Sequence, residues 1–337
     1  MRHDDRLFLV TGATGKTGSG TVNLLLERGH RVRAMVHRED DRSRALATAG
    51  AEVVVADFHD LDGVTAAVHG VSGAYFCYPI APGLLDATAV FAQAATEAGV
   101  QSVVNMSQIS ARRDSASNAA RAHWLAERLL DRTGLLTAHL RPTLFAEWLK
   151  VWWEVRDGEG FLRLPLGEGR HAPIAAADQA YVIAALLTDP NPHDHAVYSL
   201  HGPVEQSHYD IAKAMADELA FPVSYEPVSV EEFTSAMRTR GLPGHFVQHL
   251  GAIALDYRDG IFAGTNDIVT KIGGRTPLTV EQYVARDRAS FTHSGPYFVP
   301  APGMDAVHGR GHQVAGGVRG GRDQVLRVGT HGDPIGT

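Results

Sequence analysis

Residues 7–18 read LFLVTGATGKTG, a short apolar run followed by glycines at positions 12, 15 and 18. The apolar run predicts a buried strand, and the apolar periodicity that follows Lys16 predicts a helix. Between the two, Gly12 can make a tight turn, Gly15 lets the backbone approach a diphosphate, and Gly18 lets the helix pack closely on the strand. The helix start adds free N–H groups and a partial positive charge, so this stretch predicts a site for the pyrophosphate of a dinucleotide.

The competing interpretation of this loop is the phosphate loop of NTPases. Gly15-Lys16-Thr17 matches the end of the motif G-x-x-x-x-G-K-[ST]. That motif needs its first glycine five residues before Gly15, where this chain has Val10 inside the predicted strand. The sequence therefore favours the dinucleotide loop.

Further strands are predicted up to residue 140. Short runs rich in β-branched residues alternate with helical patterns, at residues 32–36, 53–56, 73–78, 102–106 and 136–140. Several of them are apolar on both faces, as strands that are covered by helices on both sides must be. This rhythm predicts an α/β fold, a Rossmann-type doubly wound parallel sheet with helices on both faces.

Composition limits the functional class. The 337 residues include 31 basic and 38 acidic side chains, giving a net charge of −7 without a basic run, so no nucleic-acid partner is expected. Cys77 is the only cysteine, which excludes an internal disulfide framework and is typical of the cytoplasm. No apolar run reaches the roughly 20 residues that cross a bilayer, and the charged amino terminus precedes too short an apolar run for a signal peptide. We expect a soluble cytoplasmic protein without membrane contact.

Domain boundaries are predicted from changes in this pattern. Residues 1–145 are expected to form the dinucleotide-binding domain. Residues 146–292 are expected to form a smaller α/β domain for a substrate or partner, from which the chain can cross back to the first domain. Residues 293–337, rich in Gly and His, predict a flexible tail. In the smaller domain Asp178 and Ser207 are expected to be N-caps of helices.

Three later runs resemble a known family. They are, in order, Val103-Val104-Asn105-Met106-Ser107, His123-Trp124-Leu125-Ala126-Glu127 and Leu140-Arg141-Pro142. Together with the glycine loop they resemble the NmrA-like family of atypical short-chain dehydrogenase/reductases over roughly residues 6–291. The resemblance implies an NAD(P)-binding, quinone-oxidoreductase-like protein. The cofactor-binding positions implied in this way are Gly12, Thr14, Gly15, Lys16, Thr17, Gly18, His37, Arg38, Asp57, Phe58, Tyr78, Pro79 and Ser107.

The end of the second predicted strand bears on the choice between NAD and NADP. An acidic residue at this position binds the ribose of NAD, whereas arginine accommodates the 2′-phosphate of NADP. The strand ends in His37 and Arg38, which are followed by Glu39 and Asp40. In the resemblance, the position that often carries arginine falls on His37, and Arg38 comes one residue later. The alternative is therefore that these residues form a solvated turn of mixed charge in which Arg38 contacts no ligand. We favour NADP(H) over NAD(H).

Two further strand ends are candidate contacts of the cofactor. Asp57 and Phe58 end the third strand, where the resemblance places an acidic side chain and backbone near the adenine; in the alternative, Asp57 caps the turn into the next helix. Tyr78 and Pro79 close the fourth strand at the carboxyl edge of the sheet, where the cofactor and substrate are expected to meet.

The catalytic candidates differ from those of ordinary short-chain dehydrogenases. Ordinary short-chain dehydrogenases use a Tyr-x-x-x-Lys pair after the fifth strand, in which lysine lowers the tyrosine pKa. The string Tyr209 to Lys213 lies well past the sixth strand, and we interpret it as a coincidence. The helix after the fifth strand offers His123 and Glu127 instead, one turn apart. His123 could relay a proton or bind a carbonyl with Glu127 orienting it; an ordinary surface pair is the alternative.

Ser107, together with Gln108, follows the fifth strand, where the superfamily places an active-site serine. Either side chain could bind the nicotinamide amide or a substrate oxygen, although strand ends also favour polar caps. A group of aromatic residues could line a flat pocket at the domain junction or form the apolar stripe of a helix. These residues are Phe145, Trp148, Trp152 and Trp153.

No metal site is predicted. His193 and His195 flank Asp194 in a Pro-rich loop, and His308 and His312 lie in the tail, with no third ligand at a fixed spacing.

Two functional hypotheses follow. The first is an NAD(P)H-dependent oxidoreductase that transfers hydride to a small quinone or a similar flat acceptor, since the cofactor carries the chemistry and the protein has to position it. The second, also implied by the resemblance, is a non-catalytic NAD(P)-binding redox sensor that regulates a protein partner; the missing Tyr-x-x-x-Lys pair favours it. An epimerase or reductase for a nucleotide-linked or natural-product substrate rests on fold analogy alone.

Overall fold

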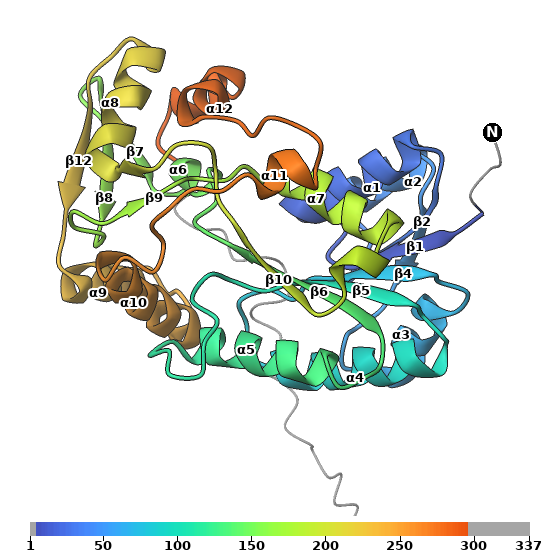
Figure 1. Cartoon of the computed structure of the whole chain (residues 1–337). Helices are drawn as coiled ribbons and strands as arrows, with labels where there is room; N and C mark the ends of the chain where they lie inside the picture. Colours follow the sequence, from blue (N-terminus) through green and yellow to red (C-terminus); the bar gives the residue numbers. More distant parts are fainter. Residues whose placement is uncertain (1–4, 296–337) are drawn as a thin grey trace, which may run out of the picture.

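The computed structural model describes residues 5–295. Its centre is a seven-stranded, all-parallel sheet of order β10-β6-β5-β4-β1-β2-β3 (Figure 1). The strands are β1 (Leu7–Val10), β2 (Arg31–Val36), β3 (Glu52–Val55), β4 (Gly73–Phe76), β5 (Ser102–Met106), β6 (Leu136–Pro142) and β10 (Ala196–Leu200). The first six agree with the predicted strands to within two residues at each end. The predicted doubly wound sheet is therefore confirmed.

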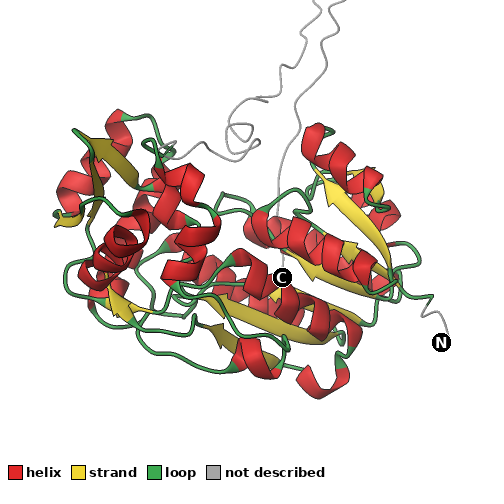
Figure 2. Ribbon diagram, turned by 90° about the horizontal axis from the view of Figure 1, so that it is seen from above, coloured by secondary structure: helices red, strands yellow, loops and turns green. Residues whose placement is uncertain are grey.

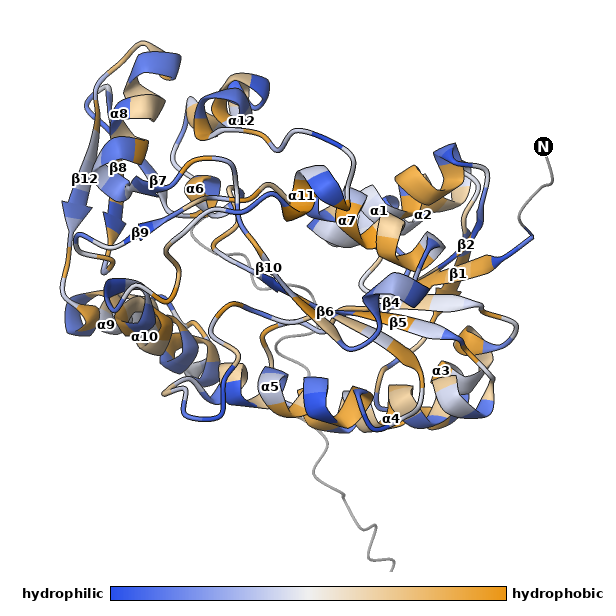
Figure 3. Ribbon diagram, in the orientation of Figure 1, coloured by the Kyte–Doolittle hydropathy of each residue, from blue (hydrophilic) through white to orange (hydrophobic). Residues whose placement is uncertain are grey.

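Helices cover both faces of this sheet (Figures 1 and 2). One layer contains α1 (Lys16–Glu27), α2 (Asp41–Thr48) and α7 (Ala176–Thr188), and the other contains α3 (Leu61–Val68), α4 (Leu84–Glu97) and α5 (Asn118–Leu130). In β1, Phe8 and Val10 pack into the core on the side of α1 and α7. Leu7 and Leu9 pack into the core on the side of α3 and α4. Both faces of β1 are thus buried, which is why the strand is apolar throughout (Figure 3).

A second, smaller group of elements packs around its own apolar core. It contains a three-stranded sheet of order β12-β8-β7 and a two-stranded pair, β11 and β9. Its strands are β7 (Trp153–Arg156), β8 (Glu159–Leu164), β9 (Arg170–His171), β11 (Gln206–Ser207) and β12 (Val223–Pro227). Its helices are α6 (Trp148–Val151), α8 (His208–Leu219), α9 (Val230–Thr239), α10 (Gly244–Arg258) and α12 (Val280–Arg286), with a 3₁₀ turn at Arg288–Phe291. Helix α11 (Ile268–Lys271) and the 3₁₀ turn Asn191–His193 pack instead on α7 and β6 of the first group.

The chain returns to the first sheet after entering this second group. Helix α7 packs on α1, where a Cβ at Gly20 would lie 3.0 Å from the Cβ of Ala180. Strand β10 then pairs in parallel with β6 and forms the edge of the sheet. The sequence pattern did not reveal this strand, because it is short and only half-buried, and so lacks a continuous apolar run. The boundary after residue 145 stays a prediction, and nearly all of the predicted tail lies outside the described residues.

The two predicted helix caps had different outcomes. Ser207 caps α8 as predicted, with the Asp210 side chain completing a capping box. The prediction for Asp178 is wrong, because Ala175 occupies the cap of α7. Asp178 is fully buried and binds a distant segment, with Arg275 Nε at 3.1 Å and the Leu278 N–H at 2.8 Å. None of the helices within residues 5–295 is long and apolar enough to cross a membrane.

Candidate cofactor and substrate site

The glycine loop connects β1 to α1 with little space to spare. Gly12 adopts φ +57°, in the left-handed region that favours glycine. A Cβ at Gly18 would lie 2.3 Å from the Gly12 carbonyl oxygen, and a Cβ at Gly15 would lie 3.0 Å from the same atom. The tight turn at Gly12 and the close packing at Gly18 are therefore geometric requirements of this backbone.

The N-terminus of α1 is open to an anion. Gly15 is its N-cap and makes no side-chain capping bond, and its first turn has no acidic residue. Gly12, Gly15 and Lys16 are exposed at this point, with Thr14 half-buried beside them. Helix N-terminal amides without a capping side chain bind phosphate groups readily. The loop therefore fits the diphosphate of a dinucleotide.

Two threonines attach this loop to β4. Thr11 Oγ1 accepts the Cys77 N–H at 2.9 Å, and Thr17 Oγ1 lies 2.8 Å from the Tyr75 hydroxyl. Burial raises the pKa of Tyr75 well above its ordinary value, so the phenol stays neutral and can share its hydrogen with Thr17. Sequence reasoning missed Tyr75, although its place opposite Val10 in the sheet follows from the predicted strands. The loop thus lies at the switch point between β1 and β4, where dinucleotides bind in this class of sheet.

The end of β2 presents two exposed basic side chains, His37 and Arg38. Arg38 has no hydrogen-bond or ion-pair partner among the residues that the structure describes. The neighbouring acidic residue Asp40 is engaged elsewhere, because it caps α2 and binds Arg42 with Arg42 Nη2 at 2.6 Å. Arg38 is therefore available to an anionic group beside the end of β2.

The residues that follow β3 and β4 lie together. Asp57 Oδ1 accepts the His59 N–H at 2.9 Å, which lowers the Asp57 pKa and corresponds to the turn-capping alternative. Phe58 packs edge-on against Tyr78 with 5.5 Å between ring centroids. The Tyr78 hydroxyl donates to the Pro82 carbonyl at 2.8 Å, and burial raises the Tyr78 pKa to about 12. Tyr78 is therefore a neutral, fixed ring, and Pro79 is exposed next to it.

Ser107 is the first residue after β5 and takes part in a buried polar network. Its Oγ donates to Glu127 Oε1 at 2.6 Å. Arg141 of β6 binds the same carboxylate with two bonds, Nε to Oε1 at 2.8 Å and Nη2 to Oε2 at 2.5 Å. Glu127 is fully buried, so its carboxylate has no access to solvent. The structure thus brings together residues from three of the runs that carried the family resemblance.

His123 does not belong to this network. Its side chain is buried, its Nδ1 has no hydrogen-bond partner, and burial lowers its pKa to about 3. Within the described residues Glu127 binds Ser107 and Arg141, so the interpretation that Glu127 orients His123 is wrong. The alternative of a surface pair is wrong too, because both side chains are buried. The helical spacing put the two residues on neighbouring stripes, but the carboxylate turns toward the end of β5 instead. A neutral His123 does not supply a proton at neutral pH.

Apolar side chains follow the ends of three neighbouring strands. Ile80 comes after β4, Ile109 after β5 and Trp148 after β6, and all three are half-buried against the core of the second group. Trp148 stacks on Trp152 with ring centroids 4.7 Å apart. Trp152 is 8% exposed and Trp153 is fully buried, so these two are core residues. The helical stripe of the alternative is not formed, because α6 ends at Val151 and Trp153 lies in β7. Trp148 remains a candidate for contact with a flat ligand.

Helix α10 holds the loop between β5 and α5 in place. The sequence did not predict this contact. Arg112 binds Asp256 with two bonds of 2.7 and 2.6 Å. One face of the same helix carries His249, whose Nδ1 lies 2.8 Å from Oγ of Ser117, the N-cap of α5. The spacing of seven between residues 249 and 256 was the only signal in the sequence. These contacts hold the loop after Ser107 against the second group of elements.

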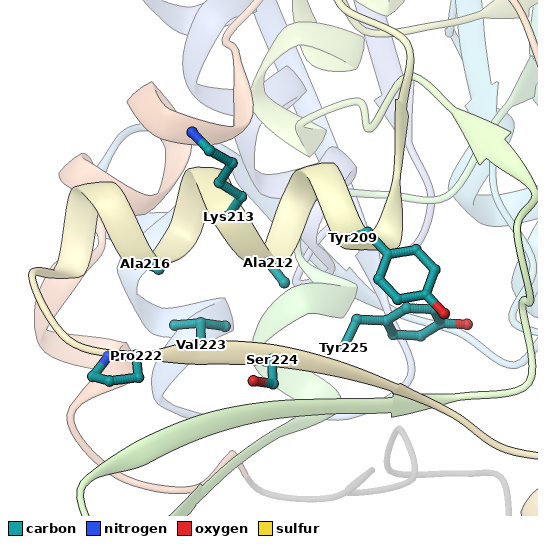
Figure 4. Close-up of a pocket in the computed structure, with 8 residues that line it drawn as sticks. All are labelled: Tyr209, Ala212, Lys213, Ala216, Pro222, Val223, Ser224 and Tyr225. Carbon is teal, nitrogen blue, oxygen red and sulfur yellow. The ribbon is translucent and has the colours of Figure 1, made fainter.

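The Tyr209–Lys213 string lies in a surface groove between α8 and β12, with a volume of about 410 Å³ (Figure 4). Figure 1 shows this region at the opposite end of the molecule from α1. The Lys213 ammonium points away from the Tyr209 hydroxyl and pairs with Asp217 at 3.2 Å. Desolvation and the nearby Glu168 carboxylate raise the Tyr209 pKa, the opposite of what catalysis requires. This geometry agrees with the interpretation that the Tyr209–Lys213 string matches the catalytic motif by chance.

The histidines that raised the question of a metal have other partners. His193 Nδ1 lies 2.6 Å from the Tyr198 hydroxyl, and His195 Nδ1 lies 3.2 Å from Asp131 Oδ1. In residues 5–295 no group of three or more His, Cys, Asp or Glu side chains could hold a metal ion. His308 lies outside the described residues, as does His312.

Comparison with known proteins gives the family. Residues 4–267 match the NmrA-like family. The chain is 29% identical to an NAD(P)H azoreductase of Xenophilus azovorans over 85% of this chain and 99% of that protein. It is similar to the crystal structure of an NADPH-dependent quinone oxidoreductase of Escherichia coli complexed with NADPH, with a TM-score of 0.73, 22% identity, and coverage of 83% and 99%. A structure of the negative transcriptional regulator NmrA with NAD gives a TM-score of 0.72 at 15% identity, covering 83% and 94%. Because the family match spans most of the chain, this protein belongs to the NmrA-like family.

Proposed function

We propose that the protein is an NAD(P)H-dependent oxidoreductase that reduces a small flat acceptor such as a quinone. The observation that carries this proposal is the open N-terminus of α1 beside apolar strand ends. The glycine loop is built for a diphosphate, and Ile80, Ile109 and Trp148 offer an apolar, partly aromatic surface at the neighbouring strand ends. Pockets for flat organic ligands are typically apolar with a few placed polar groups. The names of the azoreductase and the quinone oxidoreductase support the same class of reaction.

Different residues of the chain would bind the cofactor and exclude water from the site. The bound cofactor supplies a hydride from its reduced nicotinamide ring. The α1 N-terminus binds the diphosphate, Tyr78 and Pro79 border the path between β1 and β4, and Ser107 lies at the end of the next strand. The apolar strand ends exclude water from the reacting atoms. A reducing compartment such as the cytoplasm suits both this cofactor and the unpaired Cys77.

The test is turnover by the purified full-length protein. Mixed with NADPH and a panel of quinones and azo dyes, the protein is expected to consume the reduced nicotinamide, as followed by its absorbance, at a rate that depends on both the protein and the acceptor. Addition of NADPH without an acceptor is the control. Tight NADPH binding without turnover of any acceptor would contradict the enzyme and favour the regulatory alternative.

The regulatory alternative rests on one observation. The helix after β5 carries no tyrosine–lysine pair, and its buried His123 is neutral, so the site lacks an obvious proton donor. A dinucleotide bound in such a site could report the redox state of the cell to a protein partner. Turnover of a quinone would not by itself exclude a regulatory role, because hydride transfer to a quinone depends mainly on how the cofactor and the quinone are positioned.

We further propose that Arg38 gives a preference for NADPH over NADH. Arg38→Ala is expected to weaken NADPH binding about tenfold, because a charged hydrogen bond to the 2′-phosphate is lost, and to leave NADH binding unchanged. Titration of protein fluorescence with each cofactor measures both affinities. Arg42→Ala is the matched control, since Arg42 is already held by Asp40. An equal loss of affinity for NADPH and NADH would contradict the proposal that Arg38 binds the 2′-phosphate.

A further inference from the structure

The hydroxyl group of Ser107 has a fixed polarity. A serine hydroxyl has one hydrogen to donate and lone pairs that accept. The Ser107 hydrogen is directed to Glu127 Oε1 at 2.6 Å. Glu127 forms an ion pair with Arg141 and acts as an acceptor only. What Ser107 can still offer to a ligand is therefore a lone pair, and its ligand must be a hydrogen-bond donor.

The network leaves little freedom to reverse this polarity. Arg141 holds both oxygens of the Glu127 carboxylate, which fixes the plane of the group. Glu127 is fully buried and Ser107 is 4% exposed, so water does not compete for the bond between them. The Ser107 N–H is also committed, to the Leu140 carbonyl at 2.7 Å. The serine is held in position by its neighbours on β6 and α5.

We propose that Glu127, braced by Arg141, is a positioning residue that makes Ser107 a hydrogen-bond acceptor for the carboxamide N–H of the nicotinamide. This inference rests on the proposed function, because it needs the cofactor at the switch point. The end of β2, with Arg38, is the proposed adenosine side of the diphosphate loop, so the nicotinamide half of a bound cofactor would lie on the other side of β1, toward β4 and β5. A carbonyl or quinone oxygen is only an acceptor and cannot pair with the Ser107 lone pair.

The proton balance of the reaction follows from this assignment. A quinone, NADPH and one proton give the hydroquinone and NADP⁺. Because the Ser107 hydrogen stays with Glu127, Ser107 does not deliver that proton, and the hydroquinone anion formed by hydride transfer takes it from solvent after it leaves the apolar strand ends. The role of Ser107 is thus to orient the nicotinamide ring, and it acts on the cofactor before any acceptor is bound.

The test compares NADPH with an analogue in which an acetyl group replaces the carboxamide and so removes the N–H donor. Dissociation constants are measured by fluorescence titration of the full-length protein without acceptor. The wild type is expected to bind NADPH roughly tenfold more tightly than the analogue. Ser107→Ala is expected to bring the ratio of the two dissociation constants to about one, because it weakens the binding of NADPH and leaves that of the analogue unchanged. Ser110→Ala is the matched control, because Ser110 is a buried serine on the same loop, and it is expected to keep the ratio.

Two variants of Glu127 separate positioning from a structural role. Glu127→Gln keeps an oxygen that accepts from Ser107, so it is expected to retain most of the tenfold ratio. Glu127→Ala removes the acceptor and frees the Ser107 hydrogen, so the ratio is expected to fall toward one. General damage to the fold would weaken the binding of both cofactors equally and leave the ratio unchanged.

The outcomes keep this inference apart from the proposed function. If Ser107→Ala keeps the wild-type ratio, or Ser110→Ala loses it, the assignment of Ser107 is overturned while the oxidoreductase stands. If Glu127→Ala keeps the ratio, Glu127 is not a positioning residue. If the wild-type protein binds neither cofactor, both the proposed function and this inference fail.

Discussion

Gly15→Asp is expected to lower the affinity for NADPH by about 100-fold or more while the protein stays folded. Gly15 has φ −78° and ψ 174°, an extended conformation that every residue adopts, and aspartate is a preferred N-cap. Its carboxylate would accept the free amides of the first turn of α1 and stabilise the helix by about 1 kcal/mol. The same carboxylate would occupy the donors that the diphosphate needs and repel its charge, and a 100-fold loss corresponds to about 2.7 kcal/mol. The new Cβ, 3.0 Å from the Gly12 oxygen, requires only a small shift.

Fluorescence titration with NADPH and thermal unfolding measure the two effects separately. Gly15→Asn caps the helix without a charge, so the difference between the two variants isolates the repulsion. Gly244→Asp is the control at another helix start, because a Cβ there meets no atom within 4 Å, and it is expected to leave NADPH binding unchanged. A Gly15→Asp protein that binds NADPH normally would show that the diphosphate lies elsewhere.

Acidification from about pH 7.5 to about pH 5.5 is expected to reduce the free energy of unfolding by about 5 kcal/mol. The main cause is a set of four buried histidines, and His201, whose pKa burial also lowers, acts in the same direction. Burial lowers the pKa of His123 and His208 to about 3 and of His249 to about 4, and lowers that of His171 well below its ordinary value. They stay neutral in the folded protein at about pH 5.5, whereas the unfolded chain binds a proton at each, with a pKa of about 6.5.

The sign follows from the proton count. Between the two pKa values the unfolded state binds more protons, so stability is complete above about pH 7 and is lost as the pH falls. Each histidine contributes about 1.4 kcal/mol at about pH 5.5, and the four together about 5 kcal/mol. Burial raises the pKa of Glu147 and of Asp178, and these carboxyl groups oppose the trend at lower pH.

Urea unfolding at several pH values measures this dependence. The His249→Asn protein is expected to lose about one proton from the uptake on unfolding, whereas His69→Asn, at an exposed position, is the control. A free energy of unfolding that does not change between about pH 7.5 and about pH 5.5 would contradict the assignment of neutral buried histidines.

The parts of the fold that the sequence predicted are those with a local pattern. The strands of the first sheet are buried on both faces, so their apolar runs are continuous and easily read, as Leu7–Val10 illustrates. Strand β10 is a half-buried edge, and its sequence carries no such run. Asp178 shows the same limit for caps: its sequence context suits an N-cap, but Arg275 and Leu278, about 100 residues away, bind its side chain.

The candidate site divides in the same way. The glycine loop was predictable because Gly12, Gly15 and Gly18 meet within a single turn, so that a Cβ at Gly18 would clash with Gly12 itself. The sequence by itself therefore determined the first six strands of the sheet, the loop and the class of cofactor that the loop fits. Only the tertiary structure decided that Glu127 binds Ser107 and not His123. Spacing along a helix places a side chain on a stripe, but the direction in which a carboxylate turns is set by the charged and polar groups that other strands bring to it, here Arg141 of β6.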